Sequence, residues 1–193
     1  MRAILVTTVA AMLAFAPGAH ADPDWKAVAQ ALGKEGSVQP GGVYRVGMPR
    51  SDLKVTLEGV EIKPTLALGG WLAFKPMGTV AMVMGDLVLA QDEVNPVMKK
   101  LLEGGFQITA LHNHLLRSQP ATMYMHVSGH GDALKLAAAL HDGLVLSKTP
   151  MGPTSAAAPQ PMDLDTAAVE TSLVTRVGRT AESISSPSPV PIQ

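Results

Sequence analysis

The fold is decided by residues 79–146, which read TVAMVMGDLVLAQDEVNPVMKKLLEGGFQITALHNHLLRSQPATMYMHVSGHGDALKLAAALHDGLVL. Strand-like apolar runs at 79–89, 106–112 and 122–127 alternate with two stretches whose apolar residues recur at helical spacing. The first helix ends at Gly104-Gly105, and the second is capped by Asp132 and ends at Gly143, before a short strand at 144–146. This order predicts an α+β domain, with an antiparallel sheet and two helices on one face in the ferredoxin-like βαββαβ order.

An N-terminal helix and hairpins extend this unit. Asp24 is a suitable cap for a helix over residues 25–32, and Gly33 is placed to end it. Residues 53–62 alternate between apolar and polar types around a turn at Glu58-Gly59, which predicts a half-exposed hairpin. We expect these elements to enlarge the sheet or to cover its other face.

Three smaller expectations concern single positions. Pro49 interrupts strand pairing, so residues 48–52 are predicted to form an exposed loop in which Arg50 and Asp52 make a surface ion pair. Gly85 is expected to mark a β-bulge. Asp86, near the end of its strand, is interpreted as a turn residue, with a ligand as the alternative.

The two ends of the chain differ in composition from the middle. Residues 1–21 combine Arg2, an apolar run and the small-x-small sequence Ala19-His20-Ala21, which is the pattern of a secretory signal peptide. Pro17-Gly18 interrupts the run too early for a transmembrane anchor. The mature protein is therefore predicted to be exported, to the periplasm or outside the cell. It comprises an α+β domain at 22–150 and a disordered Pro/Ser/Ala-rich tail at 151–193.

Composition excludes several function classes. The 193 residues carry 15 basic and 16 acidic side chains, and no cationic run suits a nucleic-acid partner. There is no phosphate-binding loop and no nucleophile elbow. Because the chain has no cysteine, a metal site is expected to use His, Asp or Glu rather than thiolate ligands. No small-molecule ligand and no reaction follows from these features.

The segments GDLVLAQDEVNPVMKKLLEGGFQITALHNHLL and MYMHVSGHGDALKLAAAL resemble the LppY/LpqO family of bacterial envelope and secreted proteins. The resemblance covers Asp24 to about Pro150 and implies a domain without an established activity. Longer members resemble two tandem copies, and Asp165 to Leu173 aligns with Asp24 to Leu32. The sequence after Leu173 departs from the family pattern, which implies a truncated second copy and self-association with another copy as a possible mode of assembly.

Four of the six histidines lie between residues 112 and 130. His112 and His114 are two residues apart, so on a strand their rings leave one face roughly 7 Å apart. With His126 and His130 they form the predicted ligand set for a divalent transition metal, such as zinc, and Asp132 and Asp86 are more distant candidates. The resemblance matches these four histidines to the family pattern and implies no role for them.

Strand register decides whether these rings converge, since a slip of one residue exchanges the faces. One register gathers His112, His114, Tyr124 and His126, and places Phe106 and Ile108 on the same face. The other joins the apolar residues on one face and turns His126 away from His112.

Two other interpretations of the histidines stay open. They can be hydrogen-bonded members of a structural polar layer in a non-enzymatic binding or assembly module. Alternatively, Ser128, His126 and Asp132 are the one local trio that could support metal-free nucleophilic catalysis.

Overall fold

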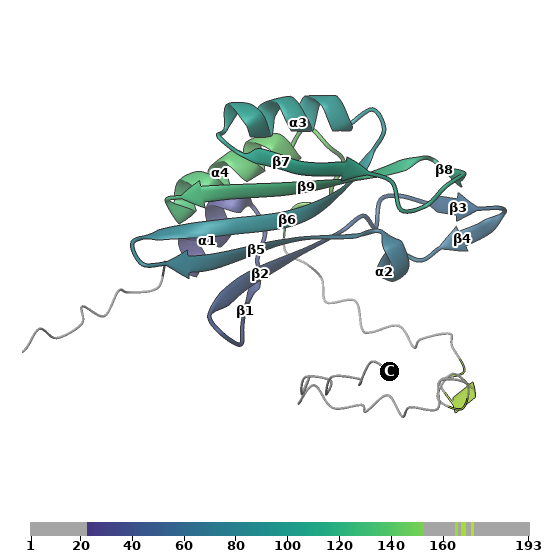
Figure 1. Cartoon of the computed structure of the whole chain (residues 1–193), viewed down its shortest axis with the longest axis horizontal. Coiled ribbons are helices and arrows are strands. Elements are labelled where there is room, and N and C mark those ends of the chain that lie inside the picture. Colours follow the sequence, from purple (N-terminus) through teal and green to yellow (C-terminus); the bar gives the residue numbers. More distant parts are fainter. Residues whose placement is uncertain (1–22, 153–164, 166, 169–170, 172–193) are drawn as a thin grey trace, which may run out of the picture. The chain divides into compact units, whose positions relative to one another are not determined.

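The computed structural model describes residues 23–152 together with residues 165, 167–168 and 171 (Figure 1). The predicted signal peptide and nearly all of the predicted tail lie outside the described residues. The chain divides into two units, one ending at Ser155 and the other beginning at Ala156. In the second unit, Asp165 Oδ1 accepts a hydrogen bond from the Ala168 amide at 3.0 Å.

An antiparallel six-stranded sheet organises the domain, in the order β1-β2-β5-β6-β9-β7. Its strands are β1 (Ser37–Gln39), β2 (Val43–Pro49), β5 (Gly69–Met77), β6 (Val80–Ala90), β7 (Gln107–His112) and β9 (Thr122–Gly131). A smaller sheet has the order β4-β3-β8. It consists of β3 (Val55–Leu57), β4 (Val60–Ile62) and β8 (Ser118–Gln119), with the short helix α2 (Pro64–Ala67) following β4.

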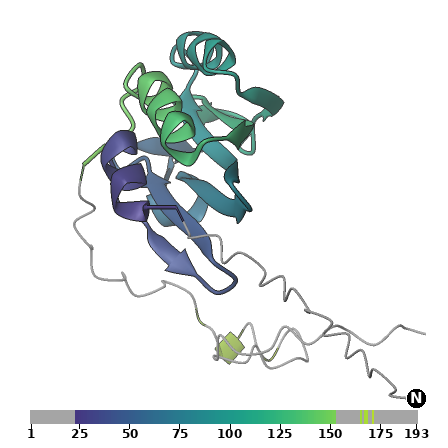
Figure 2. The same ribbon diagram turned by 90° about the vertical axis from the view of Figure 1, so that its left-hand side faces the viewer.

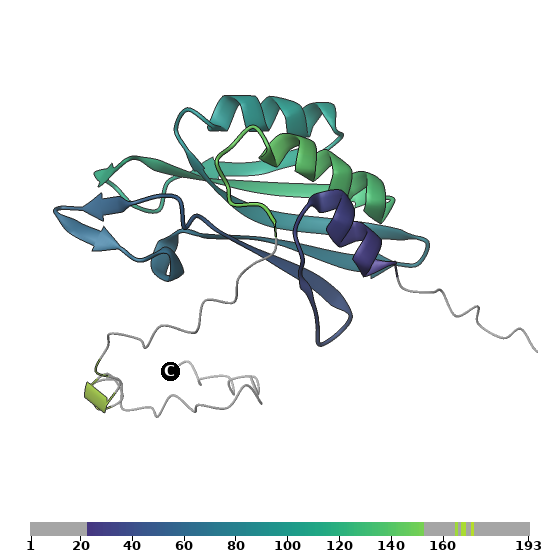
Figure 3. The same cartoon turned by 180° about the vertical axis from the view of Figure 1, so that it is seen from behind.

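Three helices cover one face of the large sheet, as Figures 2 and 3 show. They are α1 (Trp25–Leu32), α3 (Val94–Glu103) and α4 (Ala133–Leu144). The predicted caps are confirmed, because Asp24 accepts from the amides of Lys26 and Ala27 and Asp132 accepts from Lys135. Apolar residues of these helices and of alternate strand positions form the main core. None of the helices in the described ranges combines the length and apolar character needed to cross a membrane.

The α+β class and the antiparallel sheet are confirmed, whereas the predicted strand at 144–146 is wrong. Helix α4 continues through Gly143 and ends at Leu144, which is buried in the core. Gly143 does not end the helix. Its hydrogen leaves room for Leu101 of α3, whose Cδ2 would lie 2.8 Å from an added Cβ. The two neighbours of β6 in the sheet are β5 and β9, and no strand at 144–146 joins it. The complete ferredoxin-like order is therefore not found.

The predicted bulge at Gly85 is also wrong. Gly85 lies in a regular ladder between Leu72 and Val127, and an added Cβ would come 2.5 Å from Leu72 Cδ2. Glycine is therefore needed for close packing of β5 against β6. Asp86, interpreted as a turn residue, instead lies in the middle of β6.

The second face of the large sheet turns away from the helices and towards the viewer in Figure 1. We call it the open face. The small sheet and the residues after α2 cover only one end of it, where Val55 and Leu68 pack against Val88 and Tyr124. His126 and His130 of β9 lie on the remainder of this face.

Candidate functional site

A β-bulge in β7 brings the histidines together. Ile108 pairs with Val127, but Ala110 pairs with His126, so one extra residue stands between the two pairs. The bulge reverses the face on which later residues of β7 point. Ile108 packs against the core, while His112, opposite Tyr124, lies on the open face with His126.

Each of the two registers considered from the sequence therefore assigns the faces correctly over part of the strand. The pairing of the histidine register, with His112 opposite His126, is wrong, because His112 is opposite Tyr124. Before the bulge the apolar residues share the core face, and after it the polar rings share the open face. Phe106, which one register placed among the histidines, is 3% exposed in the core. The bulge removes the conflict between burying the apolar residues and gathering the rings.

Two imidazoles meet directly at the centre of this cluster. His112 Nε2 lies 2.9 Å from His126 Nε2, within hydrogen-bond distance. One ring donates its N–H and the other accepts with a nitrogen lone pair, so at least one of the two is neutral. The His114 ring centroid is 4.7 Å from that of His112, and His114 stacks on Tyr124 at 3.8 Å with an interplanar angle of 7°.

Asp86 lies beside the imidazole pair, whereas the sequence offered it only as a more distant candidate ligand and favoured a turn residue. It is directly opposite His126 in the β6–β9 ladder, and its Oδ2 is 3.8 Å from His126 Nε2. The Asp86 side chain is 16% exposed, and its buried Oδ1 has no hydrogen-bond partner in the described structure. A buried carboxylate oxygen without a partner is uncommon and indicates a group able to accept a ligand.

Tyr124 forms the base of the cluster. It is 3% exposed, and its hydroxyl donates a hydrogen bond to the Ala67 carbonyl. Burial raises the pKa of the Tyr124 phenol, and the negative charge of Asp86 raises it further. Tyr124 is therefore a neutral, fixed surface against which His114 stacks.

The other predicted site residues lie apart from this cluster. His130 is on the open face, but it is exposed and pairs with Met82, roughly 13 Å along β9 from His126. Ser128 pairs with Met84, and the Asp132 carboxylate is occupied in capping α4. Among the residues that the structure describes, no three histidine, aspartate or glutamate side chains already form a group that could hold a metal ion.

Comparison with known families gives one match: the model of the Domain of Unknown Function (DUF1259) covers residues 26–146. The chain belongs to this family. No curated protein and no solved structure matches it. The matched range includes the open face and the whole histidine cluster, so the site described above lies within the DUF1259 domain.

A second charged group in the DUF1259 domain corrects the expectation of a surface ion pair. Arg50 is 0% exposed, and it contacts not only Asp52 but also Glu93, at 2.7 Å. Its Nη1 also donates to the Val88 carbonyl at 2.8 Å. The sequence did not show this, because Glu93 is 43 residues away and looked like an ordinary helix-start carboxylate.

Glu93 is held from several sides. Burial would raise the pKa of its carboxyl, but hydrogen bonds from Arg50 and from the amides of Lys148 and Ala90 outweigh that effect. The pKa of Glu93 is therefore lower than usual. Burial would lower the pKa of Arg50, but the hydrogen bonds and charges of Asp52 and Glu93 outweigh it and raise that pKa. The pair is a fully hydrogen-bonded structural unit.

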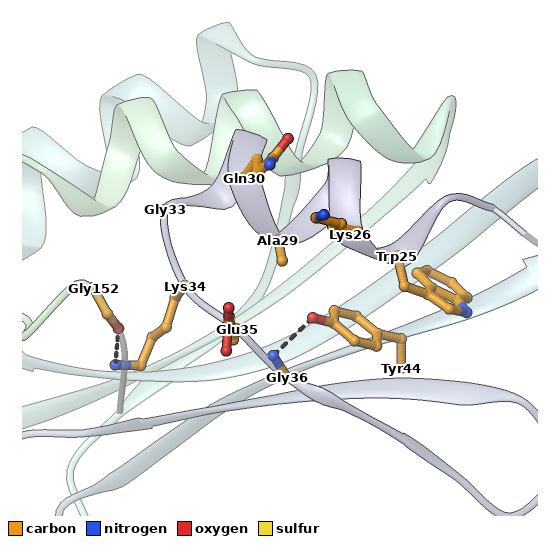
Figure 4. Close-up of a pocket in the computed structure, with 10 residues that line it drawn as sticks. All are labelled: Trp25, Lys26, Ala29, Gln30, Gly33, Lys34, Glu35, Gly36, Tyr44 and Gly152. Atoms are coloured by element: carbon orange, nitrogen blue, oxygen red, sulfur yellow. Dashed lines mark hydrogen bonds between the residues drawn. The ribbon is translucent and has the colours of Figure 1, made fainter. Parts of the chain in front are cut away.

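A hollow of about 490 Å³ lies beside α1 on the helical side of the DUF1259 domain (Figure 4). Trp25 and Tyr44 stack in it at 4.9 Å, and the Tyr44 hydroxyl accepts from the Gly36 amide. Lys34 is 5% exposed, and burial lowers the pKa of its ammonium. That ammonium donates to the carbonyls of Pro150 and Gly152, so it fastens the end of the domain to α1. These contacts explain Lys34 without a ligand.

Proposed function

We propose that this exported DUF1259 protein binds a divalent transition-metal ion on the open face, through His112 and His126. One observation carries the proposal: the two Nε2 atoms lie 2.9 Å apart on rings supplied by neighbouring strands. Neutral imidazole nitrogens are common ligands of zinc, copper and nickel. A metal ion would replace the proton that the two rings now share.

The separation of the two nitrogens bears on the choice of metal. With metal–nitrogen bonds of about 2.05 Å, a separation of 2.9 Å corresponds to an angle of about 90° at the metal. That angle is typical of tetragonal copper(II) or nickel(II). Tetrahedral zinc needs the nitrogens about 3.3 Å apart, so the rings would have to separate by roughly 0.4 Å.

A carboxylate completes the ligand set. Asp86 lies beside His126, and its Oδ1 has no hydrogen-bond partner among the described residues. A bound cation would supply that partner and offset the cost of burying the charge. His114 is the competing third ligand, although its ring is already stacked on Tyr124. Three protein ligands would leave positions open for water, which makes hydrolysis possible chemistry at the site.

The test uses the mature chain, Asp22 to Gln193, made without a histidine tag. It is stripped with a chelator and incubated separately with zinc, copper(II) and nickel(II), and the bound metal is then measured by elemental analysis. We expect about one equivalent, lost in His112→Ala/His126→Ala while the far-ultraviolet circular dichroism is unchanged.

His130→Ala is the matched control, because it removes an exposed imidazole from the same face without touching the pair. It should retain this ion. The proposal is wrong if the wild-type protein takes up no metal, or if the double variant takes up as much as the wild type.

The contacts within the cluster favour one alternative function. His112 and His126 satisfy each other by a hydrogen bond, and His114 stacks on Tyr124, as expected of a structural polar layer. In this alternative the protein is a non-enzymatic envelope binding or assembly module, which associates with a second domain copy. It predicts no stoichiometric metal and no effect of chelators on thermal unfolding.

A further inference from the structure

The open face carries a second group of side chains with sulfur and imidazole donor atoms, separate from the imidazole pair. On β6, Met82 and Met84 point to the same face as Asp86, because alternate residues of a strand share a face. In the β6–β9 ladder, Met82 is opposite His130 and Met84 is opposite Ser128. The Met84–Ser128 row lies next to the Asp86–His126 row, and the Met82–His130 row lies beyond it, each roughly 7 Å from the next.

The position of the methionines differs from that of the other apolar residues of β6. Val83 and Leu87, on the core face, are 0% and 2% exposed, whereas Met84 is 49% exposed and Met82 is partly exposed. Among the helices and strands of residues 23–152, none packs over this part of the open face (Figures 1 and 2). Burial of apolar surface therefore does not account for these two methionines.

We propose that Met82, Met84 and His130 form a site for copper(I). Thioether sulfur and imidazole nitrogen are ligands that favour copper(I) over harder cations. The chain has no cysteine, so methionine is its only soft sulfur ligand. A carboxylate would favour a divalent ion instead, and the row formed by Lys75, Met82 and His130 contains none.

The spacing allows the three side chains to converge. Residues directly opposite in an antiparallel pair have Cβ atoms about 5 Å apart, and diagonal neighbours are about 7–8 Å apart. Met82 is opposite His130, and Met84 is diagonal to it. Methionine is unbranched and flexible, so both sulfur atoms can turn towards the imidazole without a change in the backbone.

The neighbouring charge does not oppose such a site. Lys75 of β5 is opposite Met82, but its ammonium donates to the Gly41 carbonyl and is held by that contact. The copper(I) site uses side chains different from those of the proposed divalent site. Either site can therefore exist without the other.

The experiment titrates copper(I) into the untagged mature chain under anaerobic, reducing conditions, against the chromogenic competitor bicinchoninate. We expect the wild type to withdraw about one equivalent. Met82→Leu/Met84→Leu should bind at least about tenfold more weakly, because leucine keeps the volume and removes the sulfur. His130→Ala should lose a similar amount.

Met123→Leu is the matched control, since Met123 lies on the core face of β9 and packs against the main core. It should bind copper(I) as the wild type does. His112→Ala/His126→Ala should also keep copper(I), and the two-methionine variant should keep the divalent ion. If the two-methionine variant binds copper(I) like the wild type, or if copper(I) is lost only with His112 and His126, the second site does not exist.

Discussion

Two of the regions that bury charged side chains differ in how completely those side chains are hydrogen-bonded. In the Arg50 group, the guanidinium donates five hydrogen bonds, to the carboxylates of Asp52 and Glu93 and to the Val88 carbonyl. In the open-face cluster, the Oδ2 atom of Asp86 lies 3.8 Å from His126 Nε2, and its buried Oδ1 has no hydrogen-bond partner in the described structure. The first group is satisfied and the second is not.

The difference separates a structural role from a functional one. A buried charge that is fully hydrogen-bonded holds elements in place, whereas a partly satisfied one lowers stability unless a ligand completes it. The Arg50 group joins the end of β2 to β6 and to the start of α3, and Glu93 extends it to the Lys148 amide. The His112–His126 contact connects only the neighbouring strands β7 and β9, so the cluster with Asp86 holds fewer elements in place. We therefore place the ligand there.

The largest effect should come from breaking the satisfied group. Arg50→Met would leave Glu93 buried without its cationic partner, and removal of one member of a buried pair costs about 3–5 kcal/mol of unfolding free energy. Urea denaturation measures this cost. Arg117→Met is the control, because Arg117 and Glu58 form an exposed pair, 77% and 66% accessible, and the loss there should stay below about 1 kcal/mol. Equal losses in the two variants would contradict a structural role for Arg50.

The next prediction concerns how the unfolding free energy changes as the pH is lowered. The pKa of Glu93 is lowered in the folded state, so the unfolded chain binds more protons as the pH falls below the ordinary glutamate value of about 4.3. The stability that Glu93 contributes is present above that value and is lost as the pH falls through the folded-state pKa. The difference in unfolding free energy between wild type and Glu93→Gln should therefore be largest near neutral pH and shrink below about pH 4. A difference that stays constant from pH 7 to pH 3 would contradict this assignment.

The two regions also differ in how far the sequence predicted them. The helix caps at Asp24 and Asp132 and the hairpin turn at Glu58-Gly59 were predicted correctly, because each depends on residues close together in the chain. Burial of Arg50 depends on Glu93, which is distant in sequence, so Pro49 before it suggested only an exposed loop. Long-range contacts of this kind leave no local pattern.

For the open face, the sequence identified the histidines but not their arrangement. Period-two reasoning offered two registers, and the bulge between Ile108 and Ala110 combines them. A bulge needs no glycine or proline, so nothing in QITALH marks it. Asp86 was interpreted as a turn residue, with a ligand as the alternative, because it was expected near the end of its strand. Instead Gly85 packs closely against Leu72, and β6 continues to Ala90.

A smaller change in unfolding free energy, of opposite sign, is expected when Asp86 is replaced. Asp86→Asn removes a charge that the metal-free protein does not fully stabilise, so its unfolding free energy in the presence of a chelator should stay equal or rise by up to about 1 kcal/mol. The affinity for the divalent ion should fall about tenfold. Asp92→Asn, at an exposed carboxylate, should change neither quantity. A large loss of metal-free stability in Asp86→Asn would place Asp86 with Arg50 as a structural residue.

The smallest change in unfolding free energy is expected for His114→Phe. This variant also decides whether Asp86 or His114 is the third ligand. Phenylalanine can keep the stack on Tyr124, now at 3.8 Å, so the unfolding free energy should change by less than about 0.5 kcal/mol. If Asp86 is the third ligand, metal affinity measured by calorimetric titration should also be retained. Loss of affinity in this variant, with affinity retained in Asp86→Asn, would instead make the site three imidazoles. The unpartnered Asp86 oxygen would then have no connection with the metal, and the contrast with Arg50 would no longer identify the ligand site.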